Sequence, residues 1–205
     1  IGILIALNLN NKNEAAQNEA HFEKLLTQVI SELEIGIVGV NINLEIIEQK
    51  DSIISLILDD KLTKEDYAEN FFITSTISSF INYNFPDEGY LELLRNMDNV
   101  TDKHQEITKK LRQLYALNEM SKSTSDAIRD IANSTHKKWK ENKTWYWKWW
   151  KERKAQEDQI NFYLNDPLFK NDASFYRLLI DNLGRNIKKI RDRSKEIITL
   201  HSMLK

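Results

Sequence analysis

The chain has 205 residues and a formal net charge of −2, so it carries no overall excess of charge that would attract polyanions. It contains no cysteine, which excludes disulfides, thiol catalysis and cysteine-ligated metals. It has only five glycines and two prolines. Helix breakers this rare predict an all-α fold made of long helices, with enough residues for one substantial core.

The first element is a short apolar run, which comprises Ile1, Gly2, Ile3, Leu4, Ile5, Ala6 and Leu7. Alone it is too short to cross a bilayer, since a spanning helix needs about 20 apolar residues. Because the sequence does not start with methionine, we interpret the run as the end of a transmembrane helix. The start of a buried helix is the alternative. We therefore expect residues 1–14 to end a membrane anchor and residues 15–205 to form a helical-bundle domain.

The apolar run is followed by Asn10-Asn11-Lys12-Asn13-Glu14, and the two together resemble the hallmark of an uncharacterised family of Gram-negative bacterial single-pass membrane proteins. In that family the transmembrane helix ends in IGILIAL, and NNWNE and a helical domain follow. Here Lys12 stands where the family usually has tryptophan. Residues 85–90 and 165–169 match the family more loosely, in the same order.

This resemblance implies a location, not an activity. The family has a basic N-terminus, which would stay in the cytoplasm by the positive-inside rule. The protein would then lie in the bacterial inner membrane, with the domain after the anchor facing the periplasm. The family supplies no enzyme activity, ligand or cofactor.

A long helix is predicted from Phe22 to Leu58, because apolar residues recur there at a mean spacing of about 3.5 residues. A second apolar row beside the first widens this face, as is typical of a helix packed in a bundle. Gly36 and Gly39 lie within the helix and indicate either a close approach of another element or a local bend. The first row comprises Leu26, Val29, Leu33, Gly36, Val40, Leu44, Ile47, Ile54 and Leu58.

The next segments are shorter. Asp59 is expected to end the long helix, and residues 63–66 match a capping box that starts another. Residues 71–80 combine aromatic spacing typical of a helix with β-branched residues typical of a strand, and we favour the helix. Pro86 then breaks the chain, because the residue before a proline avoids helical geometry.

A very long helix is predicted to start at Asn99 and to end before Pro167, with a possible bend at residues 142–144. Its core positions become small and polar between Asn118 and Ser125, where we expect the softest packing. The last helix has an apolar row that comprises Tyr176, Leu179, Leu183, Ile187, Ile190, Ile197, His201 and Leu204. The expected architecture is a long antiparallel bundle of about four main helices, continuing from the transmembrane helix.

One segment has an unusual composition, because all five tryptophans lie between residues 139 and 150 among many lysines. On one continuous helix the rings would occupy three rows, an arc too wide to face a single core. Three interpretations remain: a membrane interface, a groove that stacks single-stranded nucleic acid, or a contact inside the protein or between copies. We predict a contact surface and no nucleic-acid partner. Its residues are Trp139, Trp145, Tyr146, Trp147, Trp149 and Trp150.

No pattern in the sequence points to catalysis. The four histidines are far apart, and none has a second ligand at the spacing of a metal pair. There is no glycine-rich phosphate loop and no nucleophile with a paired base. We therefore predict a non-enzymatic protein without metal, cofactor or small-molecule substrate. It would sense, scaffold or assemble through contacts with its own copies or with envelope proteins. The alternative is a subunit whose ligand or catalytic site forms only between subunits.

Overall fold

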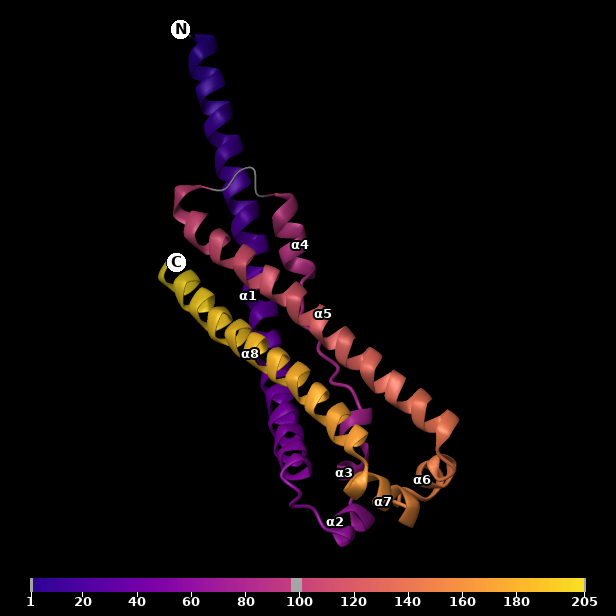
Figure 1. The fold of residues 1–205 in the computed structure, drawn as a ribbon. Coiled ribbons are helices and arrows are strands. Elements are labelled where there is room, and N and C mark those ends of the chain that lie inside the picture. Colours follow the sequence, from indigo (N-terminus) through magenta and orange to yellow (C-terminus); the bar gives the residue numbers. More distant parts are fainter. Residues whose placement is uncertain (1, 97–100, 205) are drawn as a thin grey trace. The chain divides into compact units, whose positions relative to one another are not determined.

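The computed structural model describes residues 2–96 and 101–204, with side chains described from Leu9 onward. Every regular element in these residues is helical and none is a strand, which confirms the all-α fold (Figure 1). The elements are α1 (Gly2–Leu58), α2 (Lys64–Glu69), α3 (Phe71–Ser75), η1 (Thr76–Ser78), α4 (Glu88–Arg95), η3 (Asp102–His104), α5 (Gln105–Asn142), α6 (Tyr146–Glu152), α7 (Glu157–Asn165) and α8 (Pro167–Leu204).

The helices form two compact units, and each is built from separate stretches of the chain. Unit 1 contains the described parts of residues 1–40, 84–119 and 189–205. Unit 2 contains residues 41–83 and 120–188. Helices α1, α5 and α8 each contribute residues to both units. The boundary expected at residue 14 concerns a membrane and stays a prediction.

Unit 1 combines the N-terminal part of α1 with α4, the first part of α5 and the last part of α8. The Glu32 carboxylate of α1 accepts hydrogen bonds from the backbone N–H of Gly89 at 2.8 and 3.0 Å. An anion at a helix N-terminus is stabilised by the unpaired N–H groups there, so Glu32 holds α4 against α1. The Lys110 ammonium pairs with Glu196 at 2.7 Å, which joins α5 to α8.

A second polar contact in unit 1 joins α1 to η3, the short turn that precedes α5. The buried His104 ring lies 2.8 Å from the Glu23 carboxylate, and Lys103 donates to the same oxygen at 3.1 Å. Burial raises the pKa of Glu23, but the hydrogen bonds from Lys103 and His104 outweigh this and lower it. The carboxylate therefore stays charged inside this contact.

In unit 2, residues 41–58 of α1 run antiparallel to the first part of α8. The Arg177 guanidinium donates to Asp51 at 2.6 Å, and Gly184 faces the Ile47 side chain. The expected end of α1 is confirmed: the helix stops at Leu58, and Asp60 adopts the left-handed conformation with φ of 56°. The breaks expected near Pro86 and Pro167 are also confirmed, and Pro167 is the first residue of α8.

Three sequence predictions about local structure are wrong. The very long helix expected before Pro167 is divided into η3, α5, α6 and α7, and its expected start at Asn99 lies outside the described residues. Residues 71–80 form neither one helix nor a strand, because α3 ends at Ser75 and a short 3-10 turn ends at Ser78. The hydroxyls of Thr74 and Thr76 donate to the carbonyls of Phe71 and Phe72 at 2.9 and 2.7 Å. Such side-chain bonds offer the backbone an alternative to a longer helix. In α8, Ile180 is buried in place of the expected Leu179.

Helix α1 bears on the predicted membrane anchor. Its part from Leu9 to Leu58 is long and apolar enough to cross a membrane by length and composition alone, a test that core helices of soluble proteins also pass. Gly2–Leu7 belong to the helical backbone of α1, whereas Ile1 lies outside the described residues. Further along, Val29, Leu33 and Val40 are buried in unit 1, so that part of α1 serves the protein core.

Candidate contact surface at the tryptophan cluster

The tryptophan segment is divided between two helices. Helix α5 ends at Asn142, where the Lys143 N–H donates to the Trp139 carbonyl at 2.9 Å, and the chain turns before α6 starts at Tyr146. Helix α6 ends at Glu152. The next residue, Arg153, is left-handed with φ of 54° and donates its N–H to the Trp149 carbonyl at 2.9 Å. Because α6 is short and separate, its rings do not occupy the rows expected on one continuous helix.

Three of the five tryptophans are in the core of unit 2. Trp139, Trp145 and Trp149 are buried, and their ring centroids lie 5.7, 5.8 and 6.2 Å apart in edge-to-face arrangements. Phe162 and Tyr163 of α7 pack against the same rings. Such pairs add to the free energy of burial. The prediction that these three tryptophans belong to a contact surface is therefore wrong, because other parts of unit 2 already cover them.

A buried polar network fixes this aromatic core to α3. The Trp149 indole donates to the Thr74 hydroxyl at 3.0 Å, and the Tyr163 hydroxyl donates to the Thr74 carbonyl at 3.0 Å. Gln159 donates to the Tyr163 hydroxyl at 2.8 Å. Burial raises the pKa of Tyr163, so its hydroxyl stays neutral and remains a donor. These bonds set the orientation of α6 and determine which of its rings face outward.

The remaining two tryptophans are accessible. Trp147 is 59% exposed and Trp150 is 36% exposed, while the adjacent Tyr146 is half-buried. The ammonium groups of Lys148 and Lys151 lie 5.7 and 6.0 Å from the Trp147 ring centroid. The Arg153 guanidinium lies 4.6 Å from the Trp150 centroid. We call this set, Trp147, Lys148, Trp150, Lys151 and Arg153, the basic tryptophan surface.

The basic tryptophan surface combines exposed aromatic area with three cations. Tryptophan and arginine are enriched among the residues that dominate protein–protein binding energy. Lysine and arginine add attraction for an acidic partner, and this attraction weakens in salt. The arrangement therefore suits contact with an acidic surface.

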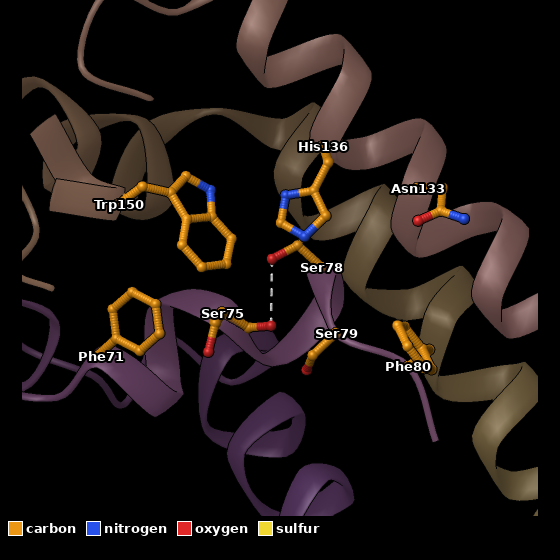
Figure 2. Close-up of a pocket in the computed structure, with 8 residues that line it drawn as sticks. All are labelled: Phe71, Ser75, Ser78, Ser79, Phe80, Asn133, His136 and Trp150. Atoms are coloured by element: carbon orange, nitrogen blue, oxygen red, sulfur yellow. Dashed lines mark hydrogen bonds between the residues drawn. The ribbon is translucent and has the colours of Figure 1, made fainter. Parts of the chain in front are cut away.

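A cavity of about 260 Å³ lies beside this surface, between the α3–η1 segment and α5 (Figure 2). Its lining residues are Phe71, Ser75, Ser78, Ser79, Phe80, Asn133, His136 and Trp150. Burial lowers the pKa of His136, although a hydrogen bond to the backbone of Ser78 opposes this. The cavity could not be predicted from the sequence, because its two walls are more than 50 residues apart in the chain and no local pattern connects them.

Lys50 is a buried cation that was not predicted from the sequence. It is 2% exposed, and its ammonium donates to the Thr76 carbonyl at 2.7 Å and to the Ser79 hydroxyl at 2.6 Å. Burial lowers the pKa of Lys50 to about 8. One signal was present, since residues 50 and 51 fill the gap between Ile47 and Ile54 in the apolar row of α1.

Within residues 2–96 and 101–204, no three histidine or carboxylate side chains lie close enough together to hold a metal ion. The fold and the surface define an all-helical protein with one helix apolar enough to span a membrane. Searches against family models, curated proteins and solved structures find no match.

Proposed function

We propose that this chain is a membrane-anchored helical protein that acts in sensing, scaffolding or assembly through protein contacts, without catalysis. The observation that carries the proposal is the division of the tryptophans on α6. Trp149 is buried by the protein itself, whereas Trp147 is left 59% exposed between two lysines. Exposed aromatic area of this kind marks interaction sites, because it promotes association when it has no partner.

The anchor part of the proposal rests on the apolar run Ile1–Leu7, its resemblance to the anchor of the membrane family, and the apolar character of α1. By that resemblance the protein lies in a bacterial inner membrane, with residues 15–205 in the periplasm. Cell fractionation of the natural protein tests this. Recovery in the membrane fraction, extracted only by detergent, is expected. Recovery in the soluble fraction would contradict the anchor.

The contact part commits to an acidic protein surface, on a second copy of the chain or on another envelope protein. The two lysines beside Trp147 and Arg153 above Trp150 supply the complementary charge. Arg153 forms no ion pair within the described part of the chain, so its charge is available to a partner. The free energy of binding then comes mainly from burying the Trp147 ring against the partner. The lysines set the rate of association and its dependence on salt.

The test compares Trp147→Ser/Lys151→Glu with a charge-matched control. Trp147 is mostly exposed, so the variant should lose less than about 1 kcal/mol of folding free energy. Its self-association, measured by sedimentation, or its co-purification with envelope proteins in mild detergent should fall. Lys109→Glu makes the same change of charge at one exposed lysine elsewhere and should leave association unchanged.

Two outcomes would contradict the contact proposal. One is unchanged association of Trp147→Ser/Lys151→Glu at low and high salt. The other is an equal loss in the control variant, which would show a general effect of charge instead of a local surface. Trp149→Ala serves as the core reference, because removing a buried tryptophan costs about 3–5 kcal/mol of stability.

A further inference from the structure

The cavity between the α3–η1 segment and α5 has the size and lining of a ligand site. Figure 2 shows the rings of Phe71 and Trp150 on one side and Phe80 on the other, with His136 above the serines. A dry apolar cavity of about 150 Å³ is large enough to bind benzene. The volume of about 260 Å³ here therefore has room for a flat molecule of one or two rings.

The serine hydroxyls of the lining present acceptors, whereas the Asn133 amide of α5 carries both an acceptor and a donor. The hydroxyls of Ser75, Ser78 and Ser79 donate to the backbone carbonyls of residues 72, 75 and 76 at 3.3, 3.3 and 3.2 Å. A serine hydroxyl has one proton and two lone pairs, so each of these oxygens has only acceptor capacity left. A ligand that hydrogen bonds to these serine oxygens must therefore bring a donor.

His136 does not change this conclusion. The Tyr146 hydroxyl lies 3.3 Å from its Nδ1 atom, and the ring also hydrogen bonds to the backbone of Ser78. Because the ring already hydrogen bonds to Tyr146 and to the Ser78 backbone, the imidazole contributes only a flat wall to the cavity. It adds no free donor that would favour an anion.

The positive charges around the cavity disfavour a cationic ligand. The Lys50 ammonium lies behind the lining, where it donates to the Ser79 hydroxyl at 2.6 Å. Its other bonds go to the carbonyls of Thr76 and Ser79 at 2.7 and 3.5 Å, so its protons are taken. The Arg153 guanidinium lies 4.9 Å from the Phe71 ring centroid and 4.6 Å from that of Trp150. A cationic ligand would be repelled, and an anionic one would meet serine oxygens without free protons.

From these observations we propose that the cavity binds a neutral, flat aromatic molecule of one or two rings that carries an N–H or O–H group, of the indole or phenol class. The ring packs between Phe71, Phe80 and Trp150, and the donor bonds to a serine hydroxyl oxygen. This inference goes beyond the proposed function, since the sequence pointed to no small-molecule partner.

The first test uses two ligands of nearly the same shape. Indole carries an N–H, and benzofuran has an oxygen acceptor in its place. Calorimetric titration of the full chain should give indole at least about tenfold tighter binding than benzofuran, the ratio expected when a buried donor–acceptor bond is lost. Equal affinities, tighter binding of benzofuran, or no binding of indole up to its solubility limit would overturn the proposal. Tighter binding of benzoate than of phenol would overturn the preference for a neutral ligand.

The second test locates the binding with a matched pair of variants on α5. Asn133 lines the cavity, and Asn133→Phe should fill it and weaken indole binding at least about tenfold. The next residue, Ser134, is exposed and does not line the cavity, so Ser134→Phe should leave the affinity unchanged. Unchanged affinity in Asn133→Phe, or an equal loss in Ser134→Phe, would place the binding elsewhere and overturn the proposal.

Discussion

Two glycines three residues apart on α1 provide a sharp test of the packing in unit 1. A Cβ atom at Gly36 would lie 2.4, 2.7 and 2.8 Å from three carbons of the Phe85 ring. At Gly39 the nearest atom to such a Cβ is the Asn84 carbonyl oxygen at 3.9 Å. Phe85 is buried and its ring packs edge-on against Tyr115 at 6.2 Å, so it cannot swing away freely. We therefore expect Gly36→Ala and Gly39→Ala to change stability in opposite directions.

The magnitudes follow from two opposing effects. Replacing glycine by alanine inside a helix stabilises it by about 1 kcal/mol, and at Gly39 nothing opposes this. At Gly36 the added methyl must displace the Phe85 ring, and overpacking of a core costs about 1–3 kcal/mol. Gly39→Ala should then gain about 0.5–1 kcal/mol, while Gly36→Ala should lose up to about 2 kcal/mol.

Urea unfolding monitored by circular dichroism at 222 nm measures both variants on the same scale. If Gly36→Ala stabilises the protein as much as Gly39→Ala, the close approach of Phe85 to α1 is refuted. A double-mutant cycle with Phe85→Leu checks the cause, because the smaller side chain should remove most of the penalty of Gly36→Ala.

The remaining predictions concern buried polar groups. The pKa of Lys50 is about 8 in the folded protein and 10.5 when unperturbed, so folding releases a proton between these values. Stability should therefore rise by about 2 kcal/mol from pH 8 to pH 10, and urea unfolding of Lys50→Met should show no such rise. Thr74→Val removes the acceptor of the buried Trp149 indole and should cost about 1–3 kcal/mol in the same assay, whereas Thr74→Ser should cost less. Burial raises the pKa of Glu23, but hydrogen bonds from two neighbouring basic side chains outweigh this and lower it below 4.5. Lowering the pH should therefore reduce the stability of the native protein by more than it reduces the stability of the Glu23→Gln variant. An equal loss of unfolding free energy in the two proteins as the pH falls would contradict this last prediction.

The positions of most helix ends could be predicted because their causes are local. Asp59, Pro86 and Pro167 lie at or beside the observed breaks, and the capping box at Thr63 forms as its sequence predicts. Most residues of the apolar row of α1 are likewise buried, although Leu44 and Leu58 are only half-buried. The choice between Leu179 and Ile180 could not be made from spacing, because both are apolar and adjacent, and packing in unit 2 decides it.

The candidate surface could be predicted only in part. The sequence indicated a bend at residues 142–144, where α5 ends, but no local pattern required a full turn and a separate helix α6. No glycine or proline lies between Asn142 and Tyr146. The turn is fixed instead by distant partners, since Trp149 bonds to Thr74, 75 positions away, and Trp139 packs on Tyr163. Composition correctly marked the segment as unusual. It could not show that Trp149 faces inward while Trp147 and Trp150 remain accessible.

The composition of unit 1 has a consequence for how the protein is made. Unit 2 has all of its residues once position 188 has been translated, but unit 1 still lacks its part of α8 at that moment. At about 5–20 residues per second, the N-terminal part of α1 waits roughly ten seconds or more for the residues of α8 that complete its core. Until then the Glu196 partner of Lys110 does not exist, and the apolar face of α1 is incompletely covered. Unit 1, although it contains the start of the chain, is therefore the last to be finished, and a nascent chain stalled at residue 188 should expose it to chaperones and proteases.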